Sequence, residues 1–139
     1  MIYLLYASTA VREFSESELD ELVATSREKN SKRDITSMLL YKNGNIIQML
    51  EGRETAVREL YAAICRDPRH HQIVKISEGH LVERAFDKWP MGFMNLDQQA
   101  IKSHPCFTKI MHHPLFDSDE HPECVACLDI LKSFIGKVE

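Results

Sequence analysis

The dipeptide Asn43-Gly44 stands between two apolar runs, and it constrains the fold of this chain more than any other feature. Both residues accept positive φ, and an Asn-Gly pair between apolar segments is a strong signal for a β-hairpin. The runs 35–41 and 45–50 are therefore predicted to be paired antiparallel strands. Apolar residues point to both faces of the first strand, for example Leu39 to one face and Leu40 to the other. A sheet of this kind must be covered on both sides.

Helix and strand patterns alternate along the rest of the chain. Ser15 and Glu18 form a capping box at the start of a helix predicted over 16–29. A later apolar stripe predicts a second helix, which ends near Asp67-Pro68 because proline disfavours helical conformation in the residue before it. Three further runs are predicted strands: 2–7, 73–76 and 91–96. The order βαββαββ predicts an α+β fold, a ferredoxin-like split βαβ sheet with one added strand.

The segment 97–139 is the predicted cover for the second face of this sheet. Its apolar residues suit two short helices: Ile101, Ile110, Leu115, Phe116, Val125, Leu128, Leu131 and Ile135. We expect the two core helices on one face and this C-terminal helical extension on the other, unless the apolar stripes serve a partner. The predicted division is a core domain over 1–96 and an extension over 97–139.

Length, charge and cysteine content restrict the classes of protein to consider. A chain of 139 residues suits one domain, and 17 basic against 21 acidic residues give a net charge of −4. This balance predicts no broad phosphate-binding surface, so nucleic acid is not the expected ligand. No apolar run approaches the ~18 residues of a membrane span, and no basic signal-peptide start is present. We expect a cytoplasmic protein whose four cysteines are thiols.

Three polar side chains fall where the pattern predicts core. Tyr6 lies late in the first strand, Gln48 lies in the middle of the third, and Asn30 ends the first helix. In a split βαβ sheet the first and third strands are neighbours, so Tyr6 and Gln48 can face each other. A buried amide costs a few kcal/mol unless it is hydrogen-bonded. Either a structural Tyr-Gln bond satisfies both groups, or the amides and the phenol converge on a polar ligand between the helices.

The same residues belong to a series of fragments in a fixed order. They are Tyr6, Asn30, Ile35-Thr36, Leu39-Leu40-Tyr41, Gln48-Met49-Leu50-Glu51-Gly52, Asp67-Pro68-Arg69-His70-His71 and Phe86-Asp87-Lys88-Trp89-Pro90-Met91. In this order and spacing, over roughly residues 2 to 96, the chain resembles a BLUF domain, a blue-light sensor that uses flavin.

The resemblance implies a role for each matching residue. Tyr6 is the expected electron and proton donor to the photoexcited flavin, and Gln48 is the amide that links this phenol to the flavin and then rearranges. Asn30 is expected to hydrogen-bond the flavin ring, with Leu22 and Ile64 on its two faces. The other matches are cofactor contacts at Ser26, Lys29, Asp67, Arg69 and His70, and signal-relay residues at Trp89 and Met91 on the last strand.

The resemblance also implies a cofactor and an output. The cofactor is FAD or FMN, and the chain is expected to be a sensor and not an enzyme. It would signal through a downstream protein or through its own oligomer.

Three positions depart from the usual pattern of the family. Ser37 stands where glycine is usual, and we expect it to strain a tight backbone position. Lys29 replaces a common second asparagine, and Ile47 replaces a frequent phenylalanine. These departures concern the pocket and leave Tyr6 and Gln48 intact.

Two other function classes stay open. Cys124 and Cys127 have zinc-site spacing, and Cys106 and several histidines lie in the same segment, which would suit a metal-binding adaptor. Two thiols on one helix face also pack as small core residues. A ferredoxin-like enzyme of the acylphosphatase type would need a phosphate-cradling loop, but segment 8–12 contains no glycine. His70-His71 has no accompanying nucleophile, so a capping or phosphate-binding role is favoured over catalysis.

Overall fold

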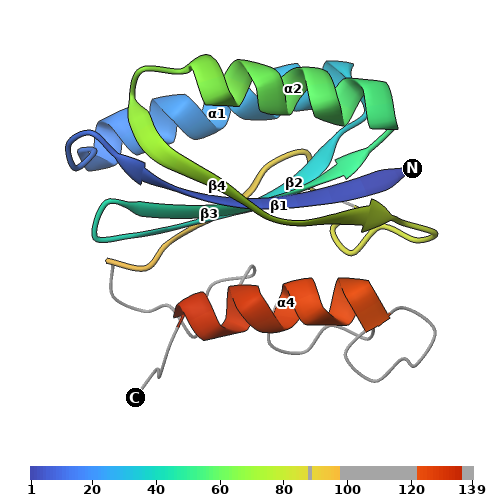
Figure 1. Ribbon diagram of the computed structural model, residues 1–139. Helices are drawn as coiled ribbons and strands as arrows, with labels where there is room; N and C mark the ends of the chain where they lie inside the picture. Colours follow the sequence, from blue (N-terminus) through green and yellow to red (C-terminus); the bar gives the residue numbers. More distant parts are fainter. Residues whose placement is uncertain (88, 98–121, 136–139) are drawn as a thin grey trace.

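A computed structural model of the chain describes residues 1–87, 89–97 and 122–135 (Figure 1). Their elements are β1 (Ile2–Ala10), α1 (Glu16–Lys32), β2 (Thr36–Lys42), β3 (Asn45–Gly52), α2 (Glu54–Arg66), β4 (His70–His80), β5 (Gly92–Asn95) and α4 (Pro122–Ile135). Figure 1 shows three layers, with α1 and α2 on one face of the sheet and α4 on the other. The strand order is β4-β1-β3-β2-β5, in which β5 runs parallel to β2 and the other pairs are antiparallel. The predicted ferredoxin-like α+β fold is confirmed.

The hairpin between β2 and β3 forms as its sequence predicts. Asn43 and Gly44 have φ angles of 50° and 80°, the left-handed conformation that a two-residue hairpin turn requires. The ladder runs from Lys42 opposite Asn45 to Thr36 opposite Glu51. The turn therefore sets which residues of β2 and β3 share a face.

The helix boundaries follow their capping signals. Ser15 accepts a hydrogen bond from the N–H of Glu18 and the Glu18 side chain returns one, so the predicted capping box is present. α1 continues to Lys32, three residues further than predicted, and the Arg33 N–H closes it onto the carbonyl of Asn30. α2 ends at Arg66, directly before Asp67-Pro68, as expected.

β4 is much longer than its predicted core of 73–76. Among the described strands it lies at the edge of the sheet and pairs with β1 alone, and its residues are exposed or half-buried. Its register against β1 shifts twice, and Gln72 has a φ of 53°. A polar edge strand with bulges has no regular apolar alternation, so the sequence signal covers only its middle.

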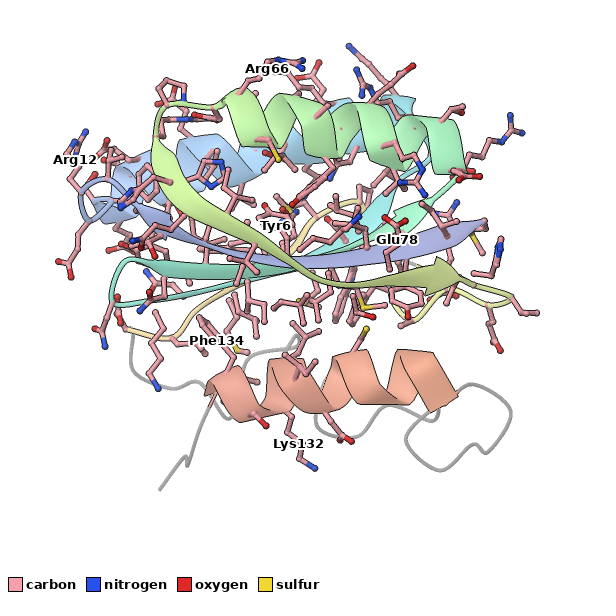
Figure 2. All side chains as sticks on the ribbon, viewed as in Figure 1. Tyr6, Arg12, Arg66, Glu78, Lys132 and Phe134 are labelled. Atoms are coloured by element: carbon pink, nitrogen blue, oxygen red, sulfur yellow. The ribbon has the colours of Figure 1, made fainter. Side chains whose placement is uncertain are left out.

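The predicted cover of the back face is present in α4. Met38 and Leu40 of β2, together with Met49 of β3, pack in one buried cluster with Leu131 and Ile135 of α4. In Figure 2 Phe134 lies on the side of α4 that faces the sheet, whereas Lys132 points away from it. The second helix predicted in the extension falls within 98–121, outside the described residues.

The described residues also bear on two features considered above, a membrane span and a metal site. None of their helices is long and apolar enough to cross a membrane. They contain no group of three metal-ligating side chains, and Cys127 is buried in the core with α4. The remaining zinc-ligand candidates of the tail lie outside the part whose side chains are described.

A buried carboxylate connects β3 to the loop before β5. Glu51 is fully buried on the back face, where it accepts hydrogen bonds from the N–H groups of Ala85 at 2.7 Å and Phe86 at 2.9 Å. The Thr36 hydroxyl donates to it at 3.0 Å, and Arg84 donates in turn to that hydroxyl. Burial raises the pKa of the Glu51 carboxyl, and these hydrogen bonds oppose the rise. Because Glu51 is fully buried, water does not compete for these hydrogen bonds, and the carboxylate anchors the loop before β5 to β3.

We expect Glu51→Gln to lower the free energy of unfolding by about 1–3 kcal/mol, because its NH₂ group would face a buried N–H donor. The matched control is Glu59→Gln on the exposed side of α2, which should change the value by less than about 0.5 kcal/mol. Urea denaturation measures both. Equal stability of the two variants would show that the carboxylate does not anchor the loop.

Candidate functional site

The phenol of Tyr6 and the amide of Gln48 form a buried pair on the sheet face covered by α1 and α2. The residues are directly opposite in the register of β1 and β3, and each side chain is about 3% exposed. The Tyr6 hydroxyl donates to Gln48 Oε1 at 2.5 Å, and Gln48 Nε2 donates to Met91 Sδ at 3.4 Å. Figure 2 shows Tyr6 on the helix-covered side of the sheet. The amide thus points its carbonyl end at the phenol and its amino end at the sulfur.

Burial keeps the Tyr6 phenol neutral. Desolvation raises its pKa well above the ordinary value near 10, and the Tyr61 side chain, whose ring centroid lies 5.6 Å away, raises it further. Nearby Cys65 and Asp67 act in the same direction. A neutral phenol hydrogen-bonded to a neutral amide holds a proton that can leave only together with an electron or by way of a strong base.

The pair forms part of the wall of a cavity of about 100 Å³ between the sheet and the two helices. Ten of the residues predicted from the sequence line it: Tyr6, Leu22, Ser26, Asn30, Gln48, Ile64, Asp67, Arg69, His70 and Met91. They come from β1, α1, β3, α2, the turn before β4, the first residue of β4 and the segment before β5. The fold therefore brings together side chains that are up to 85 positions apart in the sequence.

The walls of the cavity are aliphatic and its polar groups are few. Leu22 comes from α1 and Ile64 from α2. Asn30 is buried and donates through Nδ2 to the Pro90 carbonyl at 2.8 Å and to the Ser37 hydroxyl at 3.3 Å, which uses both hydrogens of that nitrogen. Its carbonyl oxygen is then the end suited to accept from a ligand. Apolar walls with a few oriented amides fit a flat ring that has hydrogen-bonding groups at its edge.

Charged and polar residues lie at one end of the cavity, where α2 passes into β4. Arg69 forms an ion pair with Asp67 at 2.5 Å, and its hydrogen bond lowers the pKa of the Asp67 carboxyl. His70 Nε2 lies 2.6 Å from the Ile64 carbonyl and must donate to it. In the neutral imidazole, Nδ1 then accepts from the Ser8 hydroxyl at 2.7 Å. His70 thus joins the end of α2 to β1.

Two predicted site residues lie elsewhere. Lys29 lines a neighbouring groove of about 430 Å³ with Glu18, Glu21 and Arg69, and it does not line the cavity itself. Trp89 packs against the buried cluster on the back of the sheet. Its ring lies so near Gly92 that a Cβ there would approach it to 3.0 Å. Lys29 sits one residue before Asn30 on α1 and therefore projects in a different direction.

The structure corrects the placement of Trp89 and Met91 on the last strand. β5 begins only at Gly92, so both residues lie in the segment before it. Pro90 between them has no N–H to donate to a ladder, which delays the start of the strand. Free of strand pairing, Met91 lies at the cavity and Trp89 on the opposite face.

The strain expected at Ser37 is absent. Among non-glycine residues, positive φ occurs in the described chain at Asp34, Asn43 and Gln72 and not at Ser37, which lies in extended β2. A side chain is therefore accepted there without backbone cost, and its hydroxyl joins the hydrogen bonds around Asn30 and Pro90.

Four cavity residues are additional to the sequence prediction: Phe14, Leu39, Ile46 and Leu60. Strand alternation places Ile46 on the face of Gln48, and Leu60 lies one helical turn before Ile64, so both carry a signal. Leu39 is opposite Gln48 in the ladder, which the hairpin register also indicates. Phe14 lies in the turn before α1, where no periodicity points to it.

Comparison with known proteins gives one consistent result. Residues 1–92 match the family described as BLUF, sensors of blue-light using FAD. The antirepressor BluF of Escherichia coli strain K12, described as blue light- and temperature-regulated, is 33% identical over 93 residues, which are 67% of this chain and 23% of that protein. The photoactivated adenylate cyclase subunit beta of Euglena longa is 39% identical over 83 residues, which are 60% of this chain and 10% of that protein.

A solved structure of Klebsiella pneumoniae BlrP1 with FMN and cyclic diGMP has the same fold. Its TM-score is 0.78 at 24% identity, and the match covers 98% of this chain and 34% of that chain. The chain spans a quarter or less of the length of both curated relatives. Because the family match runs through β1, α1, β2, β3, α2 and β4, including both partners of the Tyr6–Gln48 pair, this chain belongs to the BLUF family.

Proposed function

We propose that this chain is a blue-light sensor that binds one flavin noncovalently in the cavity between α1 and α2. The observation that carries the proposal is the hydrogen bond from Tyr6 to Gln48 in the wall of a cavity lined by aliphatic residues of both helices. Its output is proposed to be a light-dependent contact with a partner protein or with a second copy of the chain, and not a reaction catalysed by the chain.

The residues of the cavity fit a flavin. Leu22 and Ile64 are suited to the two faces of its ring system, and the Asn30 carbonyl is suited to accept from the ring N–H. Gln48 Nε2 has a second N–H besides the one directed at Met91, which suits a ring carbonyl. These are the contacts that a flat heteroaromatic group with apolar faces and a polar edge requires.

The charged end of the cavity suits the ribityl chain and the phosphate of a bound flavin. Arg69 lines both the cavity and the neighbouring groove, and Ser26 and Lys29 belong to α1 beside it. We assign Asp67, Arg69 and His70 to this side. FAD and FMN share the ribityl phosphate, so this assignment holds for either. The family description names FAD, and the BlrP1 structure contains FMN.

When bound, the flavin supplies visible absorption and, once excited, a strong oxidant. The chain's part is to hold a donor whose electron and proton leave together. Tyr6 is neutral, buried and already directed at Gln48 Oε1, so its proton has a defined path. Gln48 has a donor end and an acceptor end, and rotation or tautomerisation exchanges them without moving net charge. Such an exchange alters the hydrogen bonds to Tyr6, to Met91 and to a ring carbonyl at once.

We further propose that residues 1–96 hold the flavin and that residues 97–139 carry the output. α4 is the described part of this extension, and it buries Leu131 and Ile135 against the hairpin strands. The segment 89–91 spans both faces, with Met91 at the cavity and Trp89 against the cluster that contains α4 residues. Repacking at Trp89 would therefore reach α4 through this shared cluster. A cytoplasmic location is part of the same proposal.

Tyr6→Phe should keep the flavin, since the ring fills the same space, and should abolish the reversible red shift under blue light because no phenolic proton remains. Gln48→Leu should abolish it because the reversible amide is lost. The matched control is Tyr61→Phe, which removes the neighbouring phenol on α2 and should leave the red shift in place. Absorption spectra before and after illumination measure all three. A red shift in either Tyr6→Phe or Gln48→Leu contradicts the assigned roles.

The raised pKa of Tyr6 gives a pH test. The fold favours the neutral phenol, so its contribution to stability is fully present below the ordinary pKa near 10 and is lost progressively as the pH rises from there through the higher folded value. Phenolate absorbance of the wild type and of Tyr6→Phe should therefore coincide up to about pH 11, with circular dichroism confirming the fold. One additional phenolate in the wild type near pH 10 would contradict a buried, neutral Tyr6.

If residues 97–139 carry the output, illumination should change the protection of the backbone amides in α4. Illumination should increase amide hydrogen exchange in 122–135 by about 5-fold or more, which corresponds to an ordinary coupling free energy. The same illumination of Tyr6→Phe is the control and should change nothing. Exchange measured by mass spectrometry on the full chain checks this. Unchanged protection of α4 in an illuminated wild type that shows the red shift would rule out this route.

A further inference from the structure

We propose that Ser37 is an additional signal-relay residue, whose hydroxyl passes the state of Gln48 to the backbone beside Trp89. The inference rests on the photosensor function proposed above and extends it to a position outside the cavity lining. Ser37 stands where glycine is usual in the family that the sequence resembles, so the relay would belong to this chain and to relatives with the same serine.

Ser37 contacts the segment before β5 through three hydrogen bonds and Asn30 of α1 through a fourth. Its backbone N–H donates to the Trp89 carbonyl at 3.0 Å, and its Oγ lies 2.9 Å from the Pro90 carbonyl. The same Oγ lies 3.3 Å from Met91 Sδ and accepts from Asn30 Nδ2 at 3.3 Å. The residue is fully buried, so water does not compete for these partners. Ser37 thus contacts three consecutive residues of the segment that crosses the sheet.

The Ser37 hydroxyl has two acceptors and one hydrogen. It donates either to the Pro90 carbonyl or to Met91 Sδ, and at rest the carbonyl is nearer and is the stronger acceptor. Met91 Sδ meanwhile accepts from Gln48 Nε2. In the resting arrangement each of these acceptors therefore has a donor of its own.

An exchange of the two ends of the Gln48 amide disturbs this balance. Its carbonyl oxygen would then face Met91 Sδ, so the sulfur would lose its donor and meet another acceptor. Among the hydrogen bonds of the described residues, the Ser37 hydroxyl is the other donor to that sulfur. Rotation of the hydroxyl toward Met91 would remove one of the two donors to the Pro90 carbonyl and leave Asn30 Nδ2.

The consequence falls on Trp89. Pro90 links Met91 at the cavity to Trp89 on the back face, and Trp89 packs on the cluster that contains Met38 and residues of α4. Weakening the hold on the Pro90 carbonyl allows Trp89 to shift against that cluster. A single hydrogen bond of this kind corresponds to about a 3- to 10-fold change in an equilibrium or a rate.

The test uses the full chain loaded with flavin. Trp89 is the single tryptophan, so 5-fluorotryptophan labelling gives one ¹⁹F resonance from the relay segment. Ser37→Ala removes the hydroxyl, and Ser37→Thr retains one. Ser77→Ala is the matched control, because it removes a hydroxyl that bonds Tyr3 on the far edge of the sheet at 3.2 Å. Absorption and ¹⁹F spectra are recorded in the dark and under blue light.

We expect Ser37→Ala to keep the flavin red shift, to lose most of the light-induced ¹⁹F change, and to alter the dark-recovery rate about 3- to 10-fold. Ser37→Thr and Ser77→Ala should retain the ¹⁹F response. If Ser37→Ala packs poorly, Ser37→Gly replaces it, since glycine is the usual family residue and equally lacks the hydroxyl.

Two results would overturn the relay. One is a full ¹⁹F response in Ser37→Ala or Ser37→Gly, and the other is its loss in Ser37→Thr, which would indicate packing and not the hydroxyl. A wild type with no red shift would refute the photosensor function itself, and this outcome is separate from both.

Discussion

The register between β1 and β3 is the constraint on which the rest of the site depends. It sets Tyr6 directly opposite Gln48 and turns both toward the helices. A slip of β3 by one residue would turn Gln48 to the other face, into the apolar layer beneath α4, and away from Tyr6. The hairpin turn at Asn43-Gly44 fixes β3 against β2 and so sets the face of the sheet on which Gln48 lies. The turn thus places the amide, and the ladder between β1 and β3 places the phenol opposite it.

Burial of polar groups on the helix-covered face makes the site depend on complete hydrogen bonding. Each buried side-chain nitrogen or oxygen in the described chain has a partner. Tyr6 bonds to Gln48, Gln48 to Met91, and Asn30 and Ser37 share the Pro90 carbonyl. Because an unpaired buried group is costly, a change at one amide forces its neighbours to find new partners. A signal can then travel by exchange of hydrogen bonds without movement of net charge.

Local patterns in the sequence predicted the order of elements and the polar residues Tyr6, Asn30 and Gln48, whereas the other predicted cavity residues came from the resemblance to the family. The capping box, the Asn-Gly turn and the proline after α2 mark boundaries within a few residues, and strand alternation places Tyr6 and Gln48 on one face. It could not give the full length of β4, which is stabilised by the ladder with β1 and not by apolar content of its own.

Sequence patterns could not show on which face of the sheet Trp89 and Met91 each lie. Both are large and apolar and suit either face. The outcome depends on the tertiary contacts of Pro90 with Asn30 and Ser37, which no local pattern carries.

Glu51 explains why a rearrangement at Gln48 would be felt at Trp89 and not throughout the loop. Gln48 and Glu51 lie three positions apart on β3 and therefore face opposite sides of the sheet. Gln48 reaches Met91 near the end of the loop, and Glu51 holds its beginning through the N–H groups of Ala85 and Phe86. The Phe86 carbonyl accepts from the Trp89 N–H, so a change in hydrogen bonding near Pro90 meets a fixed point three residues earlier. One strand thus supplies both the amide that changes and the carboxylate that confines the change to the segment beside α4.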